Sequence, residues 1–151
     1  MSSADARSAA RLAAAQALYQ MEVGGRALNE SLADLEAHWI GQEVEGDQYK
    51  PAELSLFRQI VRGVLDDQRD IDRALDDTLS QGWPLRRIEA LMRAILRAGE
   101  FELRSCPQTP ARVVIKEYVD LAAAFFEREE AGMINAVLDR RARIERAPEF
   151  A

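Results

Sequence analysis

The stretch Ile88–Leu103, with the sequence IEALMRAILRAGEFEL, decides the fold of this chain. Its first half carries apolar residues at helical spacing, namely Ile88, Leu91, Met92, Ile95 and Leu96. These residues cover too wide an arc for a helix that exposes one face to solvent. We therefore predict that this helix, which runs to about Leu103, is the buried centre of the fold.

Helical periodicity continues on both sides of this stretch, and no segment has the alternation that is typical of a strand. Helices are predicted from Ala4 to about Glu22, from Leu28 to Trp39, from Pro51 onwards, from Thr109 to Phe125 and around Met133–Leu138. The third of these either continues past Asp66–Arg69 or breaks there into two helices. The pattern predicts an all-α compact bundle of about six or seven helices.

The later helices carry more detailed expectations. Thr109 is predicted as the N-cap, with Pro110 in the first turn. We expect the helix that follows to bury its apolar residues, which are Val113, Val114, Val119, Leu121 and Phe125. Residues 127–131 are expected to form a short connection, and the chain beyond Arg140 to end in a frayed tail.

Composition favours one globular domain over residues 1–151. With 48% hydrophobic and 30% charged residues, the chain is too apolar for a disordered protein and too charged for a membrane-spanning one. No signal-peptide pattern precedes the first helix, so we expect a cytoplasmic protein. A single cysteine, Cys106, and a single histidine, His38, exclude a Cys/His zinc cluster. No cofactor is expected.

The charge of −6 is unevenly distributed along the chain. Residues 29–82 hold most of the excess acid, whereas the two flanking segments are close to neutral and contain arginines. The sharpest enzyme-like motif lies in the acidic segment, where Asp66, Asp67 and Asp70 form a DDxxD pattern that can hold Mg²⁺ and diphosphate. No second acidic motif opposes it, so we interpret it as a solvated helix face. We expect no catalytic residues and no metal site.

Two surfaces remain as candidate binding sites. Arg7 and Arg11 are four residues apart on the first predicted helix, and Gln16 and Tyr19 follow near its flank. Two cations, a polar group and an aromatic ring suit single-stranded RNA, but an exposed helix start with Tyr19 half buried fits equally well. Asn135 interrupts an apolar run, so it either bonds backbone in the core or faces a ligand.

Four blocks of the sequence together resemble the NusB family of bacterial transcription antitermination factors. The first is Arg7-x-x-x-Arg11 followed by AQALYQ at 15–20. The others are ILRAGEFEL at 95–103, Pro110 with VVIKEYVDLA at 113–122, and MINAVLD at 133–139. Each block alone is an ordinary helix pattern, but four in the same order and spacing are specific, and they span nearly the whole chain.

The resemblance implies two packed helical subdomains, at about 4–80 and 84–145. It also implies a non-enzymatic protein that pairs with the ribosomal protein NusE, binds the single-stranded boxA element of nascent ribosomal RNA, and acts in an RNA polymerase antitermination complex. The RNA-facing residues it implies are Arg7, Arg11, Gln16, Tyr19, Glu129 and Met133. The partner-facing residues are Glu89, Met92, Arg93 and Arg97, within the NusE-contacting stretch 89–97.

Two other functions stay open at this point. Similar helical modules occur at the N-terminus of ribosomal RNA methyltransferases, although this chain has no room for a cofactor-binding domain. A helical interaction domain without RNA binding is the third possibility. The sequence also leaves open whether the protein is a monomer or a weak homodimer.

Overall fold

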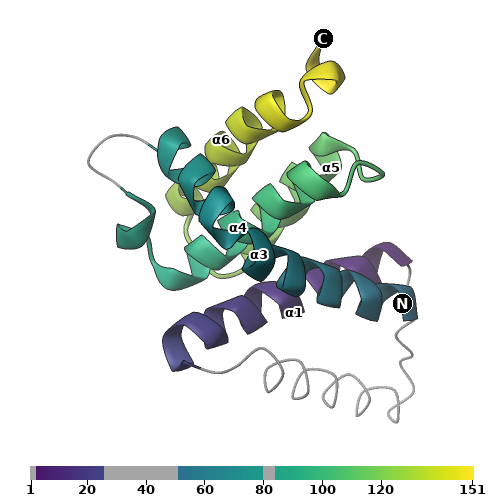
Figure 1. Cartoon of the computed structure of the whole chain (residues 1–151), viewed down its shortest axis with the longest axis vertical. Coiled ribbons are helices and arrows are strands. Elements are labelled where there is room, and N and C mark those ends of the chain that lie inside the picture. Colours follow the sequence, from purple (N-terminus) through teal and green to yellow (C-terminus); the bar gives the residue numbers. More distant parts are fainter. Residues whose placement is uncertain (1–2, 26–50, 80–83) are drawn as a thin grey trace. The chain divides into compact units, whose positions relative to one another are not determined.

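The computed structural model describes residues 3–25, 51–79 and 84–151, and every regular element in these ranges is helical (Figure 1). The elements are α1 (Ser3–Gly24), α3 (Pro51–Thr78), the 3₁₀ helix η1 (Leu85–Arg87), α4 (Ala90–Ser105), α5 (Ala111–Ala123), α6 (Arg128–Glu145) and the 3₁₀ helix η2 (Ala147–Phe150). The predicted all-α class is confirmed. The helix predicted at 28–39, which contains His38, lies outside the described residues.

Backbone contacts divide the chain into two compact units, Met1–Arg62 and Gly63–Ala151. The division falls inside α3, whereas the sequence placed the subdomain boundary near residues 80–84. The subdomains at 4–80 and 84–145 therefore stay a prediction, and each unit is described by itself below. None of the helices in the described ranges is long and apolar enough to cross a membrane.

The helix α1 is rich in alanine. Its buried residues include Ala6, Ala10, Ala13, Ala14, Ala15 and Ala17. Alanine has the highest helix propensity, and its small side chain lets a neighbouring backbone approach closely. Gly25 follows the last turn with a φ of +65°, the left-handed conformation that commonly ends a helix. The predicted end of this helix at Gly24 and Gly25 is confirmed.

The long helix α3 is kinked at Asp67, which has non-helical angles of φ −110° and ψ 16°. Of the two alternatives at Asp66–Arg69, the structure shows a continuation with a local break. Apolar residues are buried on both sides of this kink, with Ile60 and Val61 before it and Ile71 and Leu75 after it. Both halves of the helix therefore have a buried apolar face.

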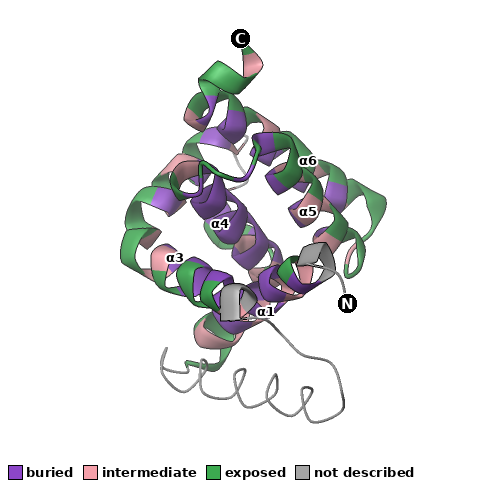
Figure 2. Ribbon diagram, turned by 90° about the vertical axis from the view of Figure 1, so that its right-hand side faces the viewer, coloured by how far each residue is buried: buried purple, intermediate pink, exposed green. Residues whose placement is uncertain are grey.

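Within the second unit, α4 is the central helix, as predicted. It packs against both α5 and α6. Figure 2 shows it buried along most of its length, whereas α5 and α6 each carry an exposed face. Eleven of its residues are buried, from Met92 to Leu103. The wide apolar arc read from the sequence reflects this burial.

Several buried residues of α4 are polar, and each contacts a neighbouring helix. The guanidinium of Arg97 binds both carboxylate oxygens of Asp72 on α3, at 2.8 and 3.0 Å. On the other side, the hydroxyl of Tyr118 on α5 donates to Oε2 of Glu102, and both residues are fully buried. Unpaired, these groups would destabilise the core, so α4 is held in one register against both neighbours.

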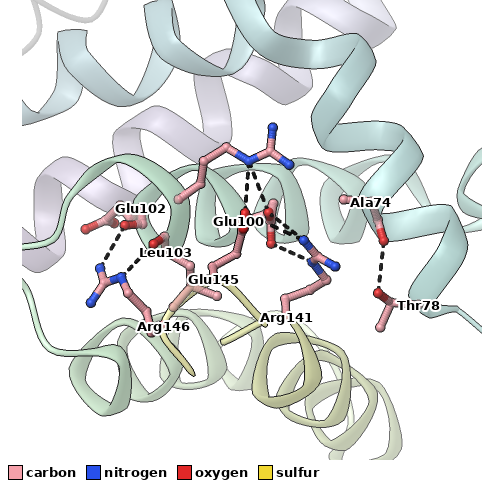
Figure 3. Close-up of polar contacts among 9 residues, drawn as sticks. Ala74, Thr78, Glu100, Glu102, Leu103, Arg141, Glu145 and Arg146 are labelled. Atoms are coloured by element: carbon pink, nitrogen blue, oxygen red, sulfur yellow. Dashed lines mark hydrogen bonds and ion pairs between the residues drawn. The ribbon is translucent and has the colours of Figure 1, made fainter. Parts of the chain in front are cut away.

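A cluster of four charges joins α4 to α6 (Figure 3). Arg141 on α6 donates from Nε to Oε1 of Glu100 at 2.9 Å. Arg104 lies 3.3 Å from Glu100 and 3.1 Å from Glu145. Burial raises the pKa of Glu100 to about 7, although its hydrogen bond from Arg141 acts in the opposite direction. Two guanidinium groups therefore meet two carboxyl groups inside one helix interface, and one of these carboxyls titrates near neutral pH.

Arg146, directly after α6, caps the end of α4. Its guanidinium donates to the backbone carbonyls of Glu102, Leu103, Cys106 and Thr109, at distances between 2.6 and 3.1 Å. The last carbonyls of a helix have no partner within the helix, and a cation satisfies both their hydrogen bonds and the helix dipole. The prediction that the chain frays beyond Arg140 is therefore wrong, because α6 continues to Glu145 and Arg146 is buried.

Three other local predictions are also corrected. The N-cap of α5 is Pro110, one residue later than the predicted Thr109, and α6 begins at Arg128, inside the predicted connection. Val113 and Phe125 are 42% and 48% exposed. The buried residues of α5 are Ala111, Val114, Tyr118 and Ala122. They are spaced three or four apart, so position on the helix decides burial more than side-chain hydrophobicity does.

We predict opposite effects from alanine at two helical glycines. A Cβ at Gly63 on α3 would clash with the ring of Phe101 on α4, whereas one at Gly132 on α6 would meet nothing within 4 Å. Gly63→Ala should lower the free energy of unfolding by about 1–3 kcal/mol through overpacking. Gly132→Ala should raise it by up to about 1 kcal/mol through helix propensity. Chemical denaturation measures both, and equal effects would contradict this packing.

The charge cluster predicts a pH dependence of stability. An unfolded glutamate has a pKa near 4.5, and Glu100 in the folded protein has a raised pKa of about 7. Between these values the folded state holds the proton more tightly, so stability should fall as pH rises, by up to about 1.4 kcal/mol per pH unit. Glu100→Gln should flatten this decline, measured by thermal melts from pH 4.5 to 7.5. Asp139→Asn, which removes an exposed carboxylate, is the control; an unchanged decline in Glu100→Gln would contradict the assignment.

Candidate partner-binding groove

The predicted RNA-facing residues of α1 differ in accessibility. Arg7 is exposed, whereas Arg11 is only 2% exposed, and Gln16 and Tyr19 are half-buried. Both arginines already interact within the protein. Of the two predicted phosphate contacts, Arg7 is therefore the one that solvent can reach.

Helix geometry separates these residues further. Arg7 and Arg11 are one turn apart and share a face of α1, as predicted. Nine residues separate Arg7 from Gln16, which at about 100° per residue places their side chains on opposite sides of the helix. Gln16 and Tyr19 share a second face. The helix therefore does not bring all four predicted RNA contacts onto one surface.

The four predicted partner-facing residues also differ. Glu89, the N-cap of α4, is exposed, and Met92 is 6% exposed. Arg93 folds back and donates to the carbonyls of Arg86 and Ile88, which fixes η1 against the start of α4. Arg97 is buried and bound to Asp72. The structure therefore gives Arg93 and Arg97 structural contacts of their own.

Four predicted site residues come together in one groove of about 380 Å³ between η1, the start of α4 and the start of α6. We call it the carboxylate groove, and it is lined by Arg87, Ile88, Glu89, Met92, Glu129, Glu130 and Met133. Glu89 and Met92 were predicted as partner contacts, and Glu129 and Met133 as RNA contacts. Two predicted partner contacts and two predicted RNA contacts therefore line the same groove, within the second unit.

Glu130, which lines this groove, has one carboxylate oxygen without a hydrogen-bond partner. Its Oε2 is buried without a hydrogen-bond partner, and among the described residues it is the only side-chain nitrogen or oxygen in that state. Leaving such an acceptor unpaired costs about 1–3 kcal/mol, and more for a charged group. A ligand in the groove would remove that cost only if one of its donors reached this buried oxygen.

The electrostatics of the groove favour a cationic ligand. Its lining holds three acidic side chains, Glu89, Glu129 and Glu130, and one cation, Arg87; the other lining residues are apolar. An RNA phosphate would be repelled by this arrangement, whereas an arginine or lysine side chain would be attracted. The apolar walls would pack against its aliphatic stem. The groove is thus suited to a basic side chain of a protein partner.

The sequence patterns do not mark Arg87, Ile88 and Glu130 as lining residues. The sequence predicts a connection at residues 127–131, although acidic residues are typical of the first turn of a helix, where Glu129 and Glu130 lie. That signal would have placed both glutamates at the start of α6. The start of α6 lies beside η1 because of tertiary packing, which no sequence pattern indicates.

The structure also shows where the remaining candidate residues lie. Cys106 is a free thiol that is 1% exposed. Asp66, Asp67 and Asp70 are exposed on α3. Within the part of the chain that the structure describes, no group of three or more His, Cys, Asp or Glu residues is placed to hold a metal ion. Asn135 is exposed on α6 rather than bonded in the core.

An all-helical fold whose distinctive site is an open groove of carboxylates and apolar side chains defines a binding module. The NusB family model matches residues 8–143. The chain belongs to the NusB family. The Nitrobacter hamburgensis protein named transcription antitermination protein NusB is 60% identical over 148 residues, which cover 98% of this chain and 92% of that protein. A namesake from Rhodopseudomonas palustris strain HaA2 is 58% identical, covering 97% and 87%.

Solved structures agree on the fold. T. maritima NusB superposes with a TM-score of 0.77 at 26% identity, covering 91% of this chain and 90% of that one. A crystal structure of antitermination factors NusB and NusE in complex with dsRNA gives a TM-score of 0.74 at 22% identity, covering 93% and 98%.

Proposed function

We propose that this chain is a non-enzymatic transcription antitermination factor that pairs with NusE and, together with it, binds single-stranded boxA-type RNA of nascent ribosomal transcripts in the cytoplasm. The observation that carries the proposal is the carboxylate groove with its unsatisfied Glu130. Relatives at 57–60% identity carry the antitermination name, and a structure of the same fold is of NusB with NusE and RNA.

We assign the carboxylate groove to the protein partner rather than to RNA. This changes the expected role of Glu129 and Met133, which the resemblance placed beside RNA. Their groove contains three carboxylates, and Glu130 within it needs a hydrogen-bond donor. A basic side chain of NusE meets both requirements, because it carries a positive charge and N–H donors and has no acceptor.

The RNA contacts are proposed on α1, with Arg7 as the phosphate contact. A chain with net charge −6 and few exposed arginines on this helix gains little affinity from counterion release. Its RNA binding is therefore expected to be weak alone and to depend on the surface and charge that NusE adds. Arg11, which is buried, acts by holding α1 rather than by touching phosphate.

Neutralising the groove should weaken pairing with NusE. Truncating one partner of a desolvated charge pair typically costs 2 kcal/mol or more, so Glu130→Gln should weaken NusE binding at least about tenfold. Glu89→Gln and Glu129→Gln, at the exposed rim, should have smaller effects that shrink further at high salt. Isothermal titration calorimetry with purified NusE measures all three.

The matched control for this experiment is Glu127→Gln. Glu127 belongs to the same acidic run but does not line the groove. The Glu127→Gln variant should bind NusE with the affinity of the wild type. If Glu130→Gln and the wild type bind NusE with equal affinity, NusE does not bind in the carboxylate groove.

RNA binding tests the second half of the proposal. With NusE present, Arg7→Ala should weaken binding to boxA and to scrambled RNA alike, and should reduce the slope of log K against log salt by about 0.7. Arg11→Ala should instead lower the melting temperature. Fluorescence titration over a salt series gives the slopes, with Arg69→Ala on the acidic face of α3 as control. Absence of any NusE-dependent preference for boxA would refute RNA-directed antitermination.

A further inference from the structure

We propose that the hairpin of α5 and α6 carries a second docking surface, which receives an acidic amphipathic helix of another protein. The surface is an open groove of about 590 Å³, which we call the hairpin groove. Its floor contains Ile115, Val119 and Ala131, and its rim carries Arg112, Arg128 and Asn135. No residue of the carboxylate groove takes part in it.

The two grooves lie on opposite sides of α6. Successive residues of a helix are rotated by about 100°, so Gly132, Asn135 and Asp139 fall within about 60° of one another. Met133 in the carboxylate groove points roughly 160° away from Asn135 on the same count. The hairpin groove can therefore be filled while the carboxylate groove is occupied, which suits a protein with more than one partner.

The charges at the rim are not equivalent. Its two acids already have cationic partners, since Lys116 binds Asp120 at 2.6 Å and Arg143 binds Asp139 at 3.0 Å. Within the described residues, Arg112 and Arg128 form no ion pair or hydrogen bond. Arg112 acts on Glu149 only electrostatically. The carboxylate of Glu149 accepts hydrogen bonds from Arg146 and from the backbone N–H of Ala111. The rim thus offers two guanidinium groups to a ligand.

The position of the arginines specifies the spacing of the ligand's charges. Arg112 is in the first turn of α5 and Arg128 in the first turn of α6. Because a four-residue connection makes these helices a hairpin, the two first turns lie at opposite ends of the groove. The lining residues of α5 span 112–120, which is about 12 Å of helix. A helix in the groove would place carboxylates about eight residues apart, on either side of an apolar stripe.

An acidic helix fits this groove better than RNA does. The floor is apolar, which suits the apolar face of a helix. A continuous phosphate backbone would also run past Asp120 and Asp139 on the rim. Discrete carboxylates can meet Arg112 and Arg128, which bind them through planar, two-pronged hydrogen bonds, without approaching either aspartate.

The test uses the full-length protein and two synthetic 18-residue helical peptides. Both carry the same Leu and Ala stripe, and one has Glu where the other has Lys, at flanking positions eight residues apart. The Glu peptide should bind, measured by calorimetry, and should shift backbone amide NMR signals of 112–120 and 128–139. The Lys peptide should bind at least about tenfold more weakly. Arg112→Ala/Arg128→Ala should weaken the Glu peptide about tenfold, since an exposed pair contributes up to about fivefold.

Arg73→Ala is the matched control, because Arg73 is an exposed arginine of the same unit outside both grooves. It should leave the peptide affinity unchanged. Equal binding of the two peptides, or displacement of the Glu peptide by oligouridylate, would overturn the proposal. So would self-association that the double variant abolishes, because the occupant would then be a second copy. The double variant should still bind NusE, so failure here is separate from failure of the proposed function.

Discussion

The position of α6 against α4 depends on two buried arginines, Arg141 and Arg146. Arg141 pairs with Glu100 in the middle of the interface, and Arg146 donates to two carbonyls in the last turn of α4 and to two in the loop after it. A buried pair of this kind adds little net stability compared with apolar packing, but losing one partner is costly. Its effect is to exclude other registers of α6, because any shift by one residue would leave a buried charge unpaired.

Both grooves follow from that constraint. The carboxylate groove needs the first turn of α6 beside η1, so that Glu129 and Glu130 meet Glu89 and Met92. The hairpin groove needs the opposite side of α6 beside α5. One rigid helix with two different faces can thus present a cation-binding surface and an anion-binding surface without any change of conformation. A protein that works by binding could use these two faces of one helix for two different partners.

The sequence predicts the helical class and the central helix well, because both depend on periodicity that a single chain displays. It also locates the break in α3 and the end of α1, where glycine and a run of aspartates mark local geometry. It fails where tertiary contacts decide. Arg140–Arg146 has the composition of an exposed tail, and only packing against α4 reveals Arg146 as a cap. In the same way, Tyr118 is buried in place of Val113 because of its position on α5 and its bond to Glu102.

For the site, the resemblance supplies candidate residues, and the structure shows which of them lie together. Glu129 and Met133 lie together with Glu89 and Met92, whereas Arg97 is engaged with Asp72 and Arg11 is buried. The acidic run around Glu130 indicates the start of a helix, but nothing in that run marks the unmet hydrogen bond of its carboxylate. A buried acceptor without a donor is a property of the folded chain, so it could be found only from the structure.

The central claim is that Glu130 receives a basic side chain of the partner. A double-mutant cycle tests it most directly, combining Glu130→Gln with alanine at each lysine and arginine of NusE in turn and measuring affinity by calorimetry. We predict a coupling energy of about 1.5 kcal/mol or more for one residue of NusE, in the range observed for close interfacial charge pairs. Coupling below about 0.5 kcal/mol for every lysine and arginine would contradict the account.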